Sequence, residues 1–179
     1  PEGARVLLLG NLGECVGAMN RVGILNIEGS CESMLAAFQS DGRVVVERDV
    51  GDRLAMNMNG GVVTVMGSAG KDACAGMNEG VVVVRGQASS GAGSGMLGGT
   101  LIVMGSVGPN PGLGMKGGRV IIAGSCPPPG KGSTMRSITN KEVIELEEFL
   151  EPLGLSLEED ALVLVCLLYT SPSPRDSSK

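Results

Sequence analysis

Two columns of glycine recur every 19 residues along most of this chain, and this spacing restricts the fold more than any other feature. The glycines of one column close short apolar runs, and those of the other come six positions earlier. The closing column comprises Gly10, Gly29, Gly67, Gly86, Gly105 and Gly124, with Arg48 at the remaining position; the earlier column comprises Gly23, Gly42, Gly61, Gly80, Gly99 and Gly118. Glycine at both ends of a five-residue run disfavours a helix. The sequence is therefore a repeat of short non-helical units.

The apolar runs between the two columns predict strands with one face in a core. Their second and fourth residues are always apolar, and charged residues flank them, which is the alternation of a half-buried strand. The runs are 5–9, 24–28, 43–47, 62–66, 81–85, 100–104 and 119–123. No helical crossover separates them, and antiparallel neighbours would not keep the same side-chain order at each pass. We therefore expect an all-β fold, a right-handed parallel β-helix of about six 19-residue turns.

The chain divides into four segments by composition. Residues 1–126 form the repeat domain, and because it starts almost at once with a strand we expect an N-terminal truncation. Residues 127–138 read as a Pro/Gly-rich linker, and residues 139–165 as a short capping helix, opened by a Thr139/Glu142 capping box, followed by a short strand. Residues 166–179 resemble sequencing-adapter read-through, so we expect a non-native, disordered tail.

Two further columns predict filling of the core rather than chemistry. A methionine column precedes the earlier glycines by three positions and reads as a structural ladder, because methionine commonly fills core gaps. It comprises Met58, Met77, Met96 and Met115, with Met19 as a member displaced by one position and Phe38 near the equivalent position of the second unit. Cys31 and Cys126 share a column with Val50, Ala69 and Ala88, which favours core residues over a metal or redox role.

The middle outward position of the strands is unexpectedly apolar, which makes it the candidate partner face. It carries Leu7, Val45, Val83, Ile102 and Ile121, with Asn26 and Thr64 as the polar exceptions. A row of exposed apolar residues usually marks a surface that something covers. Two covers remain open: the C-terminal segment of this chain, folded back, or a partner protein.

Composition argues against several functional classes. The chain has no histidine and no CxxC pair, so the commonest general base and most zinc sites are missing, and we assign no catalytic, cofactor-binding or metal-binding residue. The two GxGxxG matches, at 93–98 and 112–117, are the same part of the repeat and open no helix. A net charge of −5 without a basic face argues against nucleic acid, and no apolar run is long enough to span a membrane. We expect a cytoplasmic protein.

The glycine-rich part of the repeat resembles a known family. The stretch Gly91-Ala92-Gly93-Ser94-Gly95, together with units such as GMLGGTLIVMG at 95–105, is similar to the GXGXG β-helix domain found in one subunit of formylmethanofuran dehydrogenase and in the large subunit of glutamate synthase. The GM-x-GG style is closer to the dehydrogenase group. The resemblance implies a right-handed β-helix that holds no active site and scaffolds the cofactor-bearing parts of an oxidoreductase complex.

The resemblance also separates three functions. In the dehydrogenase reading, partner subunits of a one-carbon oxidoreductase carry the molybdenum or tungsten pterin and the iron–sulfur clusters, and this chain binds none. In the glutamate synthase reading, the partners carry FMN and iron–sulfur clusters and the complex assimilates ammonia. The third reading is a free-standing paralogue with hydrolase activity, for which Ser89, Ser90 and Ser94 are the serines to test.

Overall fold

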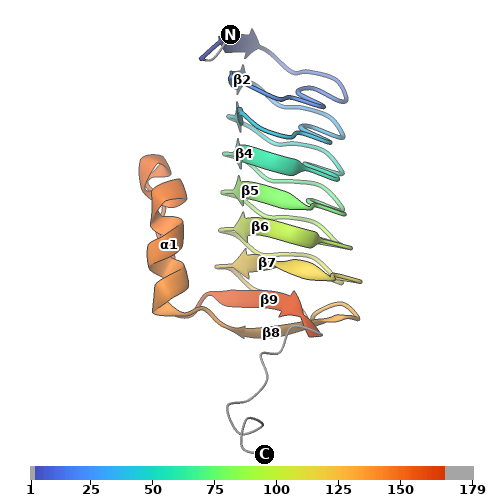
Figure 1. Cartoon of the computed structure of the whole chain (residues 1–179), viewed down its shortest axis with the longest axis vertical. Coiled ribbons are helices and arrows are strands. Elements are labelled where there is room, and N and C mark those ends of the chain that lie inside the picture. The colour runs from blue at the N-terminus through green and yellow to red at the C-terminus, as the bar shows by residue number, and fades with distance from the viewer. Residues whose placement is uncertain (1–2, 168–179) are drawn as a thin grey trace, which may run out of the picture.

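The computed structural model describes residues 3–167, and its main body is a coil of parallel strands stacked one per turn (Figure 1). The strands of the coil are β1 (Arg5–Leu9), β2 (Ile24–Glu28), β3 (Arg43–Val46), β4 (Asn59–Val65), β5 (Glu79–Val84), β6 (Leu97–Val103) and β7 (Gly117–Ile122). Each pairs in parallel with the next, and the partners are 19 residues apart, as in Arg5 with Ile24. The exceptions are Asn59 with Glu79 and Leu97 with Gly117, which are 20 residues apart and mark register shifts. The predicted parallel β-helix with a 19-residue repeat is confirmed.

The core lies inside the coil, where the second and fourth strand positions point. Val44, Val63 and Val82 have no exposed surface, and neither do Val46, Val65 and Val84 at the fourth position. A second ladder of parallel bridges runs through the column that begins Leu12, Cys31 and Val50 and continues to Ala69, Ala88 and Val107. Cys31 is buried in this column and Cys126 is half-buried against the same core, as the sequence predicted.

The GXGXG motif has a backbone explanation, because alternate residues of this corner adopt left-handed φ angles in successive turns. Gly91, Gly93 and Gly95 have φ of 75°, 75° and 63°. The same three positions two turns earlier hold Arg53, Ala55 and Asn57, which have φ between 52° and 58°. A residue with a Cβ in this region costs about 1 kcal/mol or more. Glycine at these positions therefore lowers the free-energy cost of the left-handed corner, although other residues also adopt this conformation there.

The methionine column and the earlier glycine column depend on each other. The four methionines of the column, Met58, Met77, Met96 and Met115, are buried. A Cβ placed on Gly99 would lie 2.8 Å from Cε of Met77 and 3.0 Å from the carbonyl oxygen of Gly80. The closing glycines also have no room for a side chain, since a Cβ on Gly86 would lie 2.7 Å from the carbonyl oxygen of Gly67. Both columns thus permit close stacking of turns.

The first two turns correct the extent of the methionine ladder. Met19 is 62% exposed and Phe38 is 44% exposed, because both occupy a left-handed corner position that points outward. The ladder position itself holds Asn20 and Gln39, which precede Met58 by two turns and one turn of the repeat. Gln39 is fully buried: its Nε2 donates to the carbonyl oxygen of Gly42 at 3.2 Å, whereas its Oε1 has no partner.

We expect Gln39→Met to stabilise the protein by about 1 kcal/mol, because it removes a buried acceptor without a partner and extends the methionine column. The carbonyl of Gly42 keeps its bond from the backbone N–H of Val62 at 3.0 Å. A rise of about 2–4 °C in the melting temperature, followed by circular dichroism, would match this gain. The reverse exchange, Met58→Gln, is the control and should lower the melting temperature; a lower value for Gln39→Met would contradict the prediction.

The C-terminal part closes one end of the coil and covers one side of it. β8 (Ser133–Ser137) and β9 (Leu162–Cys166) extend the sheet in the order β7-β9-β8, with β9 antiparallel to both neighbours. α1 (Asn140–Leu150) and the short helix η1 (Glu151–Leu153) lie between these strands in sequence, and α1 stands beside the stack (Figure 1). The end cap is therefore the strand pair, whereas α1 covers a lateral face.

Three expectations for this region need correction or a limit. The segment 127–138 is not only a linker, because it contains β8. The short strand expected near 161–165 is β9, and it includes Cys166, which the sequence pattern assigns to the tail but which is 2% exposed and packs in the core. Residues 168–179, the rest of the expected tail, lie outside the described residues.

Candidate interaction site

The outward column of the strands has two parts with different surroundings. Val83, Ile102 and Ile121 are fully buried, and they form a second core with Leu146 and Leu150 of α1. The strand alternation directs the three side chains outward, and the apolar stripe of α1 supplies their cover. Of the two covers that the sequence left open, the chain's own C-terminal segment occupies this part, so these three residues do not belong to a free partner face.

Four charged side chains fasten α1 to the sheet. Arg119, on the outer face of β7, lies 2.6 Å from Oε1 of Glu145 and 3.5 Å from Oε1 of Glu142. Arg136 of β8 makes a two-pronged pair with Glu142, at 2.7 Å and 2.8 Å. The capping box at the start of α1 is formed as predicted, with Thr139 and Glu142 bonding each other's backbone N–H groups. The sequence showed the capping box, but no pattern in it linked Arg119 or Arg136 to this helix.

The contacts of Glu142 lower the pKa of its carboxyl group from 4.5 to about 2, chiefly through the hydrogen bonds from Arg136 and then from Thr139. The same pair raises the pKa of Arg136. Because the folded pKa is depressed, the carboxylate contributes stability that is fully present above pH 4.5 and is lost as the pH falls toward 2.

We therefore expect Glu142→Gln to lower the free energy of unfolding by about 2 kcal/mol at pH 7, because it removes charge-assisted hydrogen bonds at a largely buried position. Urea denaturation of the variant and the unchanged protein at several pH values would measure this. The difference should narrow as the pH falls from 4.5 to 2. Glu145→Gln, at a side chain that is 53% exposed, is the control and should cost about 0.5 kcal/mol or less. Equal losses would contradict the prediction.

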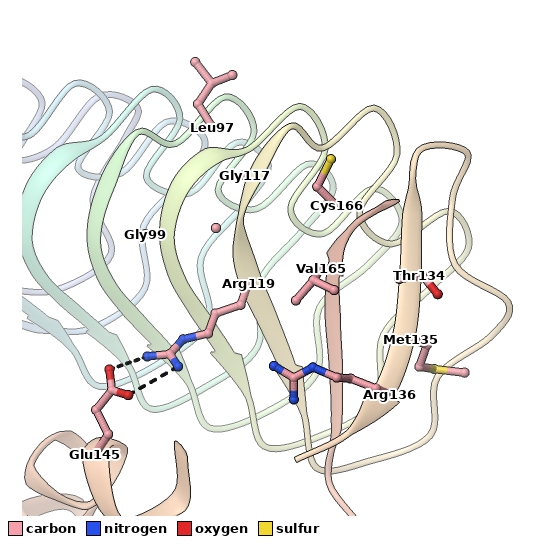
Figure 2. Close-up of a pocket in the computed structure, with 11 residues that line it drawn as sticks. Leu97, Gly99, Gly117, Arg119, Thr134, Met135, Arg136, Glu145, Val165 and Cys166 are labelled. Carbon is pink, nitrogen blue, oxygen red and sulfur yellow. Dashed lines mark hydrogen bonds and ion pairs between the residues drawn. The ribbon is translucent and has the colours of Figure 1, made fainter. Parts of the chain in front are cut away.

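A groove with a volume of about 800 Å³ lies beside this charged cluster (Figure 2). Its floor includes the bare backbone of Gly99, Gly117 and Gly118, and Arg119 and Arg136 approach it from β7 and β8. Both guanidinium groups are engaged by Glu142 or Glu145, so the charges of the four side chains balance. The groove therefore offers a ligand no uncompensated charge from this cluster.

Within residues 3–167, no helix covers the other part of the outward column. On β1 to β3 the middle outward position carries Leu7, which is 55% exposed, and the half-buried Asn26 and Val45. Leu9, which is 69% exposed, lies at the edge position that Glu28 holds on the next strand. We call this surface the free outer face. It is bordered by exposed charged residues, with Arg5 and Arg43 on one edge and Glu28 and Glu47 on the other. Thr64, on β4, is 5% exposed and marks the end of the covered part.

Other polar and titratable groups serve the stacking of turns. The side chains of Asp49, Ser68 and Ser106 each accept from the backbone N–H of the residue 19 positions later, at 2.7 to 3.1 Å. Burial raises the pKa of the thiols of Cys31, Cys74 and Cys126. Within residues 3–167, no cluster of three or more potential metal ligands is found. None of the helices in that range is long and apolar enough to cross a membrane.

These features define a parallel β-solenoid with a side helix, in which one half of the outer sheet face is covered and the other half is free. No family model matches the sequence, and no curated protein matches it either.

Proposed function

We propose that this chain is a non-catalytic scaffold subunit of an oxidoreductase complex similar to formylmethanofuran dehydrogenase. The support from sequence is the GXGXG resemblance of the units around 91–105. The support from geometry is the free outer face, where Leu7, Asn26 and Val45 continue the column that α1 covers further along the coil. A face of this kind favours a partner protein over a small substrate.

The cofactors belong to the partners in this proposal. The molybdenum or tungsten pterin and the iron–sulfur clusters of the complex lie in other subunits, and this chain sets the distance between the parts that hold them. A stack of turns suits this role because each turn adds about 4.8 Å of length in a fixed direction. In this proposal the chain and its partner subunits are located in the cytoplasm.

The test is purification of the full-length protein from its source under mild conditions. Co-purification with pterin-dependent and iron–sulfur subunits is the expected result. A monomer without oxidoreductase subunits would overturn the proposal. Partners that contain an amidotransferase domain and an FMN-binding synthase domain would instead establish the glutamate synthase alternative.

A further inference from the structure

We propose that the free outer face binds an amphipathic helix of a partner protein, with one acidic edge and one basic edge. The inference rests on the proposed function, because it specifies what kind of partner the scaffold holds. The occupant is argued from two observations: the way α1 covers the same columns further along the coil, and the charges that border the free part.

The covered part shows what fits these columns. On β5 to β7, α1 lies over Val83, Ile102 and Ile121 and runs along the stack, whereas β1 to β3 lie beyond its end (Figure 1). The 11 residues of α1 correspond to about 16 Å of helix, whereas three strands spaced by about 4.8 Å span about 10 Å from the first to the third, so the helix reaches past them. The free outer face also spans three strands, so a helix of about the same length would cover it.

The acidic edge of the partner helix is inferred from the residues that share a strand column with Arg119. Strand register places Arg5, Ile24, Arg43, Val62, Val81, Thr100 and Arg119 in one column. α1 meets Arg119 with the carboxylates of Glu145 and Glu142. Arg43 and Arg5 are exposed in the same column, and within residues 3–167 neither is part of a salt bridge. A partner helix that repeats the packing of α1 would present carboxylates to them.

The basic edge of the partner helix is inferred from the border of the free outer face opposite Arg5 and Arg43. There the free outer face carries Glu28 and Glu47, both exposed. At the equivalent positions the covered part has the exposed Arg85, and then Met104 and Ala123, which pack against the second core. A helix with the charge distribution of α1 alone would leave Glu28 and Glu47 unmatched. Lysine or arginine on that edge of the partner would complement them. The face thus selects a helix with two differently charged edges around a central stripe that packs on Leu7, Asn26 and Val45.

Three stapled peptides of about 12 residues, each with the same leucine stripe, test this specificity. One has a glutamate edge and a lysine edge, one has two glutamate edges and one has two lysine edges. Binding to the full chain is measured by fluorescence anisotropy. The mixed peptide should bind at least about tenfold more tightly than either of the others, since a like-charge edge costs at least about 1.4 kcal/mol.

Variants of the chain make the test specific to the free outer face. Val45→Asp, and independently Leu7→Asp, should weaken binding of the mixed peptide at least about tenfold. Arg5→Glu with Arg43→Glu should make the peptide with two lysine edges the tightest. These residues are exposed or half-buried, and unchanged melting temperatures would show that the variants are folded.

Several results would overturn the inference. Equal binding of the three peptides, or binding unaffected by both aspartate variants, would exclude a selective helix site. A concentration-dependent dimer that Val45→Asp dissociates, seen by analytical ultracentrifugation, would assign the face to a second copy of the chain. If the oxidoreductase subunits co-purify equally with the Val45→Asp protein, the inference fails and the proposed function stands. If the mixed peptide binds as expected but no such subunits co-purify, the proposed function fails alone.

Discussion

Gly99→Ala is expected to lower the free energy of unfolding by about 3 kcal/mol, as the sum of a left-handed Cβ penalty and overpacking. Gly99 has φ of 78°, and the new methyl group would lie 2.8 Å from Cε of Met77 and 3.0 Å from the carbonyl oxygen of Gly80. The methionine tip can move, but the carbonyl is held in the strand ladder. Equilibrium urea denaturation would measure the change.

Gly114→Ala is the matched control for this substitution. Gly114 has a similar φ of 68°, but nothing lies within 4 Å of the position of its Cβ. Only the backbone penalty of about 1 kcal/mol should remain. Arg53, Asn57 and other residues with a Cβ already adopt this conformation in the corner. If the two variants were equally destabilised, close stacking of the turns would not be the reason for the glycine column.

Ile102→Asp is expected to destabilise the protein by about 4 kcal/mol, because it places an unpaired charge in an apolar site. Ile102 has no exposed surface and lies in the second core with Leu146 and Leu150. Release of α1 from the sheet would limit the loss in free energy of unfolding. It would also expose residues 151–157 to proteases. Urea denaturation and limited proteolysis together would detect both effects.

Val45→Asp tests the same column where no helix covers it. Val45 is half-buried, so this variant should lose less than about 1 kcal/mol and should not change the protease sensitivity of α1. A comparable loss at the two positions would show that the outward column is equally buried along its length, which would remove the free outer face as an interaction surface.

The coil was predictable because its signals are local and periodic. Gly80, Gly99 and Gly118 mark the same position in successive turns, and Val82, Leu101 and Val120 follow each of them at the same distance. Within the apolar runs, strand register then follows from the 19-residue interval, whereas the register shift between Leu97 and Thr100 does not. The residue at the ladder position was wrong for the first turn because Met19 was assigned to the column as a methionine. The 19-residue interval instead places Asn20 at that position.

The C-terminal arrangement was less predictable, since it depends on contacts between segments that share no periodicity. The Thr139/Glu142 capping box locates the start of α1, and Val143, Leu146 and Leu150 indicate an apolar stripe. Neither shows what the stripe packs against. Arg119 and Glu145 are 26 residues apart and join a strand to a helix. β8 was missed because the segment Ser133–Ser137 has little apolar character and acquires its strand conformation by pairing with β9.

The reversal of strand direction at β9 has a consequence for self-assembly. Parallel coils whose two ends match can add copies end to end and grow into fibres, as edge strands template further strands. Here β9 runs against β7, and the edge beyond it is the short, largely polar β8, which carries Arg136. An incoming turn of another molecule would meet neither the strand direction nor the apolar column that it needs at this end. The β9–β8 pair therefore blocks the addition of further turns at this end of the coil.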